Sequence, residues 1–148
     1  MKYLKTYSII LILTVALNGE VFAQSNSIHI DQRIINVYGE TYANNLKNKA
    51  PERILYLNYF LDHSYEIREV TYHNDEKTPK LSSVSLNTKY TGEITRPTFN
   101  VNSFNPLLYN FKRDRIRKTQ YRVDNTNKII VFYSEQEIAK AFNQSKQN

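Results

Sequence analysis

Apolar side chains recur at every fourth position along the first helical pattern, at Ile30, Ile34, Tyr38, Tyr42 and Leu46, and predict a helix over residues 31–47. This spacing places them on one face of a helix, and Asp31 is the expected N-cap. Gly39 lies inside the pattern, where glycine weakens a helix by ~1 kcal/mol relative to alanine. It marks a close approach, a kink or the boundary between two shorter helices.

A second helix is expected over residues 51–63. Pro51 suits the first turn of a helix, and the apolar residues that follow it cover much of the helix circumference. We therefore expect this helix to be the most buried element and to form a hairpin with the helix before it. In the expected core it packs over the central strand of a sheet and contributes Leu57.

Residues rich in β-formers predict four strands, over residues 65–73, 81–90, 119–124 and 128–133. The alternation of the first strand changes phase, which predicts a bulge near Arg68 and Glu69. The second strand alternates more regularly and is expected to have one wet face. The last two strands flank the turn sequence Asn-Thr-Asn and predict a hairpin. The fourth strand is apolar on both faces, so we expect it at the centre of the sheet with Val131 buried.

The segment between the second and third strands reads as a long loop followed by a single helical turn after Pro106. Phe99, Val101 and Phe104 are its expected anchors in the core. A capping box formed by Ser134 and Glu137 predicts the start of a C-terminal helix. The element order predicts an α+β fold, in which an N-terminal helical hairpin packs on a small antiparallel sheet of about four strands and a C-terminal helix follows.

The N-terminus has the three parts of a secretory signal peptide. Two lysines in the first five residues precede an apolar run over residues 8–17, and small side chains at Val21 and Ala23 suit signal peptidase. The apolar run is about half as long as the ~20 residues that a membrane span requires. We expect cleavage between Ala23 and Gln24, which leaves residues 24–148 as a single α+β domain.

The charge of the chain favours certain partners, and its lack of cysteine excludes certain chemistries. The chain has 20 Lys and Arg against 14 Asp and Glu, and loss of Lys2, Lys5 and Glu20 with the signal leaves 18 against 13. The chain has no cysteine, which excludes disulfides, thiol nucleophiles and a lipid-modified cysteine at the cleavage site. A basic exported protein suits an anionic envelope component or an acidic protein face better than nucleic acid, although the same charge also serves solubility alone.

Catalytic and metal-binding motifs are not recognisable in the sequence. His29, His63 and His73 do not have the spacing of metal ligands, and phosphate-binding glycine loops and a nucleophile elbow are missing. Glu66 and Glu69 lie on opposite faces of the expected strand unless the bulge brings them together, as a glycosidase would need. The sequence therefore predicts no catalytic residue, cofactor or metal.

The basic segment, residues 112–118, is the most distinctive local feature, and it contains Lys112, Arg113, Arg115, Arg117 and Lys118. An extended backbone would place its three arginines on one face, whereas a helix would align only Arg113 and Arg117. Tyr109 and Tyr121 flank the segment, so guanidinium groups can stack on rings. We expect either a binding surface for an anionic or acidic partner, made of these seven residues, or a charged strand that protects a sheet edge from aggregation.

The chain resembles small, cysteine-free exported proteins of Bacteroidota-type bacteria. The resemblance lies in Val21-Phe22-Ala23-Gln24, in Val37-Tyr38-Gly39 followed by Leu57-Asn58-Tyr59, and in the ending from Ile130 to Ile138. It implies no catalytic residue. Because such bacteria have secretion and gliding machinery at the outer membrane, the resemblance implies an accessory subunit of such an assembly.

The sequence thus predicts a non-catalytic binding or accessory protein of the bacterial cell envelope. We expect it in the periplasm, with the cell surface and the medium as the alternatives. The alternative function is a small envelope hydrolase that acts on an anionic polymer, suggested by the basic segment and the acidic residues without an assigned role.

Overall fold

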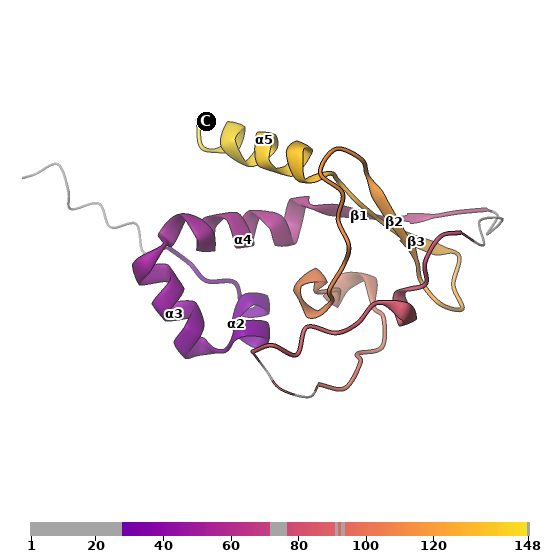
Figure 1. The fold of residues 1–148 in the computed structure, drawn as a ribbon, viewed down its shortest axis with the longest axis horizontal. Coiled ribbons are helices and arrows are strands. Elements are labelled where there is room, and N and C mark those ends of the chain that lie inside the picture. Colours follow the sequence, from indigo (N-terminus) through magenta and orange to yellow (C-terminus); the bar gives the residue numbers. More distant parts are fainter. Residues whose placement is uncertain (1–27, 72–76, 91, 93, 148) are drawn as a thin grey trace, which may run out of the picture.

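A computed structural model describes residues 28–71, 77–90, 92 and 94–147 of the chain (Figure 1). The expected signal peptide, Tyr72 and His73 lie outside the described residues. Among the residues that are described, no helix combines the length and the apolar character that crossing a membrane requires.

Two short helices occupy the region where the first helical pattern was found. Helix α2 (Gln32–Tyr38) and helix α3 (Glu40–Lys49) meet at Gly39, whose φ of 81° favours glycine over other residues. Asp31 caps α2 as expected, because its carboxylate accepts the backbone N–H of Arg33 at 2.7 Å. Of the three readings of Gly39, the boundary between two helices is therefore confirmed.

Helix α4 (Pro51–His63) has the expected bounds and begins at Pro51. It leads into strand β1 (Tyr65–Glu69) with only Ser64 between them (Figure 1). Ser64 is fully buried, and its carbonyl accepts the backbone N–H of Tyr133 at 3.0 Å. Ser64 thus fixes the end of α4 and the start of β1 against the backbone at Tyr133.

The described residues form a three-stranded antiparallel sheet with the order β1-β3-β2. Strands β2 (Thr119–Arg122) and β3 (Lys128–Phe132) form the expected hairpin, and β3 is the central strand, as its apolar sequence predicts. Val131 is buried as expected, whereas Leu57 is only half-buried.

The predicted bulge in the first strand is wrong. Strand β1 pairs residue for residue with β3, from Tyr65 opposite Phe132 to Glu69 opposite Lys128. The phase of the alternation changes only after the strand has ended, where the N–H of Val70 donates to the carbonyl of Asn127 at 2.8 Å. The irregular pattern therefore marks the end of a strand and not an extra residue inside it.

The predicted strand over residues 81–90 is also wrong. The region starts with a 3₁₀ turn, η1 (Leu81–Ser83), and continues as an extended chain with an isolated bridge between Leu86 and Tyr109. The Arg96 side chain donates to the carbonyls of Leu81 and Val84. Lys80, the residue before this region, forms an isolated bridge with Arg122 of β2. Residues 81–90 themselves do not pair with a strand of the described sheet and so do not extend it. The α+β class is confirmed, with three strands in the described part of the chain in place of about four.

Residues 99–111, expected as a loop with one helical turn, contribute much of the aromatic core. This region contains two 3₁₀ turns, η2 (Val101–Ser103) and η3 (Pro106–Leu108), and lies between the helices and the sheet (Figure 1). The ring centres of Phe111 and Phe132 are 4.5 Å apart. Phe104 is buried and Phe99 half-buried, as expected of anchors, but Val101 is 44% exposed and is not an anchor.

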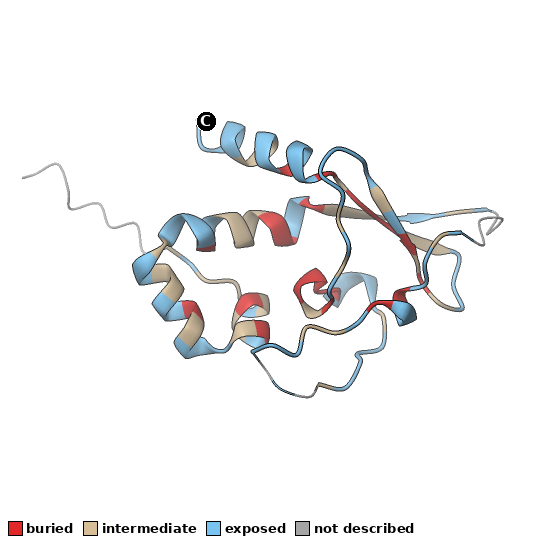
Figure 2. Ribbon diagram, in the orientation of Figure 1, coloured by how far each residue is buried: buried red, intermediate tan, exposed pale blue. Residues whose placement is uncertain are grey.

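The C-terminal helix α5 (Glu135–Ser145) begins with the expected capping box. Ser134 Oγ accepts the N–H of Glu137 at 3.2 Å, and the Glu137 carboxylate accepts the N–H of Ser134 at 2.8 Å. The helix packs beside α4, where the Phe142 ring lies 5.3 Å from that of Tyr56. Figure 2 shows that most of its outer surface is exposed.

Candidate binding groove and basic segment

The basic segment, residues 112–118, is neither a strand nor a helix; it bends over residues 115–117 before β2 begins. The Asp114 carboxylate fixes this bend by accepting the backbone N–H groups of Ile116 and Arg117, each at 2.8 Å. These hydrogen bonds hold the pKa of Asp114 below its ordinary value. The bend separates the three arginines: Arg113 is half-buried, and Arg115 and Arg117 are exposed. The interpretation as a charged edge strand is therefore wrong.

The backbone of the basic segment also contacts the start of helix α5. The carbonyl of Asp114 accepts the N–H of Glu135 at 3.1 Å, and the carbonyl of Arg115 accepts the N–H of Gln136 at 3.1 Å. The first N–H groups of a helix have no partner inside the helix, so these bonds complete the cap begun by Ser134. The basic segment is thereby held rigidly against the fold.

The rings that contact the basic segment differ from those expected. The Arg113 guanidinium lies 4.7 Å from the Phe60 ring centre, and the Lys118 ammonium lies 4.4 Å from that of Tyr133. Tyr109 and Tyr121 are each only 6% exposed, and burial raises the pKa of both phenols. The Tyr121 hydroxyl donates to the carbonyl of Lys112 at 2.8 Å. Both tyrosines therefore lie in the core, and Tyr121 supports the segment from within.

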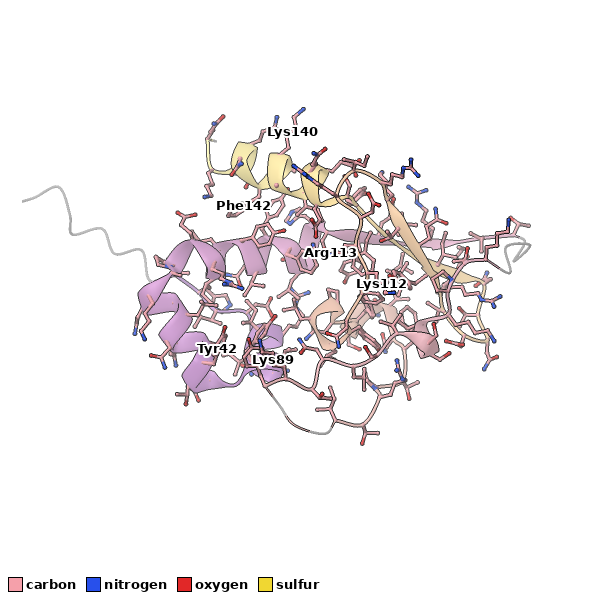
Figure 3. All side chains as sticks on the ribbon, in the orientation of Figure 1. Tyr42, Lys89, Lys112, Arg113, Lys140 and Phe142 are labelled. Atoms are coloured by element: carbon pink, nitrogen blue, oxygen red, sulfur yellow. The ribbon has the colours of Figure 1, made fainter. Side chains whose placement is uncertain are left out.

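An open groove of about 330 Å³ lies between α4 and residues 106–113. Its aromatic lining comes from Tyr38, Tyr56, Phe60, Tyr109, Phe111 and Phe132. Its charged lining, among the described residues, consists of Arg53 on α4 and Arg113 on the basic segment. Figure 3 labels Arg113, which lies beside the C-terminal half of α4. The groove therefore combines an aromatic wall with two guanidinium groups.

Arg113 has an incomplete set of hydrogen-bond partners. Its Nη1 atom is buried and has no hydrogen-bond partner among the described residues, while Nη2 lies 3.8 Å from the Glu135 carboxylate. Leaving a buried charged donor unsatisfied is costly. Since Arg53 lines the same groove, an anionic group that enters it would meet two positive charges.

A cluster of three tyrosines continues the aromatic surface beyond the groove. The rings of Tyr38, Tyr42 and Tyr90 lie 4.7 to 5.7 Å apart between centres, and Tyr38 also lines the groove. The Lys89 ammonium lies 5.2 Å from the Tyr90 ring centre; Figure 3 shows Lys89 next to Tyr42. A hydrogen bond with Tyr90 raises the pKa of Tyr42. The sequence places Tyr38 and Tyr42 on one helical face, but their contact with Tyr90 required the tertiary structure.

The histidines and acidic residues do not converge in the described part of the chain. His29 and His63 are exposed, and His63 stacks on Tyr59 with ring centres 4.3 Å apart. Glu66 pairs with Arg68, and Glu69 pairs with Lys128; without a bulge, the two glutamates lie on opposite faces of β1. Within the described ranges, no three His, Cys, Asp or Glu residues are grouped to hold a metal ion.

A larger hollow of about 520 Å³ lies at the β2–β3 turn, lined by Lys80 and residues 122–127. The carboxylate at this place, Asp124, already accepts the N–H and the hydroxyl of Ser82. Arg122, which lines this hollow, also has a buried donor without a partner among the described residues, its Nε. The described lining of the hollow contains no aromatic side chain, whereas that of the groove combines six aromatic rings with two arginines. We therefore take the aromatic groove as the candidate site.

Comparisons of the chain with protein-family models, curated proteins and solved structures found no match. Function must therefore be inferred from the groove and the basic segment of this chain.

Proposed function

We propose that the protein is an exported, non-catalytic binding or accessory protein of the bacterial cell envelope, and that its groove receives an anionic group of the partner. The observation that carries the proposal is that Arg113 and Arg53 both line the aromatic groove. Together they place two positive charges at one opening. A carboxylate or phosphate suits this pair, because guanidinium groups bind both in a planar, bidentate manner.

The residues that line the groove are of the kinds that favour binding over catalysis. Aromatic rings and arginines supply contact area and charge attraction, as at many recognition sites. Acid–base hydrolysis requires a carboxylate or histidine within hydrogen-bond reach of the substrate. Among the described residues that line the groove, the groups with a full charge are both cationic.

Titration with anionic envelope components tests the proposal. Acidic peptides, uronic-acid oligosaccharides and phosphorylated lipid headgroups are added to the purified protein. Binding is followed by tyrosine fluorescence, because the chain has no tryptophan to mask it and tyrosines line the groove. We expect at least one of these classes to bind, with an affinity that falls as salt rises.

Matched variants locate the binding. Arg113→Met and Arg53→Met should each weaken it, whereas Lys146→Met should not, because Lys146 pairs with Glu52 and does not line the groove. The proposal is wrong if none of the three classes binds, or if the two groove variants bind as the unchanged protein does.

Export and assembly require separate measurements. N-terminal sequencing of the protein from the envelope fraction should begin at Gln24, and a cytoplasmic protein that keeps Met1 would contradict export. Mild crosslinking in cells should join the protein to an outer-membrane secretion or gliding assembly if it is an accessory subunit. Loss of that crosslink in the Arg53→Met/Arg113→Met double variant would place the contact in the groove.

A further inference from the structure

The bend of the basic segment displays one apolar side chain between two cations. Ile116 is 63% exposed, more than Leu55, Tyr90 or Val101, the other large apolar residues on the surface of the described chain. Arg115 and Arg117 on either side of it are exposed, and neither forms an ion pair with a described residue. The described partners of the neighbouring cations are Glu135 for Arg113 and Glu137 for Lys118.

The bend holds Ile116 outward through backbone contacts. Its N–H and that of Arg117 are bound by Asp114, and the carbonyls of Asp114 and Arg115 are bound by the start of α5. An exposed aliphatic side chain gains nothing from such a position in water, since burying it is favourable. The bend nevertheless keeps Ile116 exposed in a fixed position. Such a position is suited to insertion of the side chain into the surface of a partner.

We propose that the tip formed by Arg115, Ile116 and Arg117 is a contact for an anionic lipid surface. Ile116 enters the headgroup region, while the two arginines remain at the level of the phosphates. The segment has five cations and one acid, and Asp114 directs its carboxylate to the backbone. A lipid surface fits better than an acidic protein face, because it accepts the apolar tip and the flanking charges together without a matching pocket. This contact is independent of the groove.

The expected binding is weak and reversible. Each basic residue near an anionic membrane surface contributes ~1 kcal/mol, equivalent to about fivefold in affinity. One isoleucine adds a similar amount when it is partly buried. Membrane attraction through charge also falls within a Debye length, so salt should release the protein.

A tryptophan at the tip provides a direct test, because the chain has none of its own. The full chain with Ile116→Trp is mixed with vesicles of phosphatidylcholine alone, or of phosphatidylcholine and phosphatidylglycerol in equal parts. We expect a blue shift of the emission with the anionic vesicles only. Val101→Trp, at an exposed position on η2, is the matched control and should show no shift.

Sedimentation with the same vesicles measures separately how much the two arginines and the inserted Ile116 side chain contribute to the affinity. The Arg115→Ser/Arg117→Ser variant should lose about 25-fold in affinity, and Ile116→Ser should lose several-fold. Lys146→Met, which removes one positive charge outside both the tip and the groove, should bind the vesicles normally, which distinguishes a contact at the tip from a general effect of net charge. The inference is wrong if the tip tryptophan does not shift, or if Val101→Trp shifts equally. Equal binding of soluble polyglutamate, unaffected by Ile116→Ser, would also overturn it and indicate an acidic-protein contact.

Discussion

The Arg113 guanidinium lies 4.7 Å from the centre of the Phe60 ring, which joins the basic segment to helix α4 across a long stretch of sequence. Phe60 is 7% exposed and belongs to the core. Arg113 thus occupies the boundary between the apolar interior and the groove, where its charge is partly desolvated.

This position predicts different effects on the free energy of unfolding for the two residues. Arg113→Met should change it by less than about 1 kcal/mol, because the loss of the cation–π contact is offset by removal of an unsatisfied charged donor. Phe60→Ala should lower it by about 3 kcal/mol through lost burial and a cavity. Urea unfolding followed by circular dichroism measures both. If Arg113→Met lowers the free energy of unfolding by much more than this, the main role of Arg113 is to stabilise the fold.

A second prediction concerns Phe111, which connects the irregular region to the sheet. Its ring centre lies 4.5 Å from that of Phe132 and 4.7 Å from that of Tyr121. Phe111→Ala should reduce the free energy of unfolding by about 3 kcal/mol. Val101→Ala, at a 44% exposed position, should cost less than about 0.5 kcal/mol. Equal thermal melts for the two variants would show that residues 99–111 do not form part of the core.

Gly39 provides a third prediction, about backbone strain. Its φ of 81° and ψ of 151° are reached almost only by glycine, although a methyl group at this position would contact nothing within 4 Å. Gly39→Ala should therefore lower the free energy of unfolding by about 1–3 kcal/mol through the backbone alone. Asn44→Ala, at an exposed position in α3, should be neutral or slightly stabilising. A stabilised Gly39→Ala protein would indicate one continuous helix.

The fourth prediction is a loss of stability in acid. Hydrogen bonds from the backbone lower the pKa values of Asp114 and Glu137, and the Arg33 side chain lowers that of Asp31. A depressed pKa in the folded state stabilises the protein above the unfolded pKa, which is 3.8 for aspartate and 4.5 for glutamate. This stabilisation is lost as the pH falls through the folded pKa.

Urea unfolding between about pH 6 and about pH 2 should therefore show a falling free energy of unfolding in the acid part of this range. Asp114→Asn should be less stable than the unchanged protein near neutral pH, and the difference should shrink in acid. If the difference is constant over the whole range, the Asp114 carboxylate does not act through its charge.

The sequence predicts the regular elements of the fold well, because their signals are local. The Ser134 capping box, the start of α4 at Pro51 and the hairpin of β2 and β3 each depend on residues within one turn or two neighbouring strands. The apolar run at β3 also predicts its central place, since both faces of a central strand are covered.

The irregular core and the groove depend on distant contacts, which a single sequence does not reveal. The alternation over residues 81–90 predicts a strand with one wet face, but only Val84 on its apolar face is buried, and Thr88 and Tyr90 are exposed. The sequence could not show that the Arg96 side chain binds the carbonyl of Val84. Likewise, the sequence predicts Arg113 as a binding residue, but it does not reveal that the ring beside it is Phe60 on α4. The density of aromatic residues at 99–111 was the one signal that this region is more than a surface loop.

The order β1-β3-β2 places the first strand of the sheet beside the last. During synthesis, β1 leaves the ribosome long before β3 exists, whereas β2 and β3 follow each other closely. The hairpin can therefore close at small entropic cost, and β1 must wait until β3 has been made. Glu66, Arg68 and Glu69 place charges on the waiting strand, and charges of this kind oppose pairing with other chains. The nascent protein is thus protected in the interval when its sheet cannot yet form.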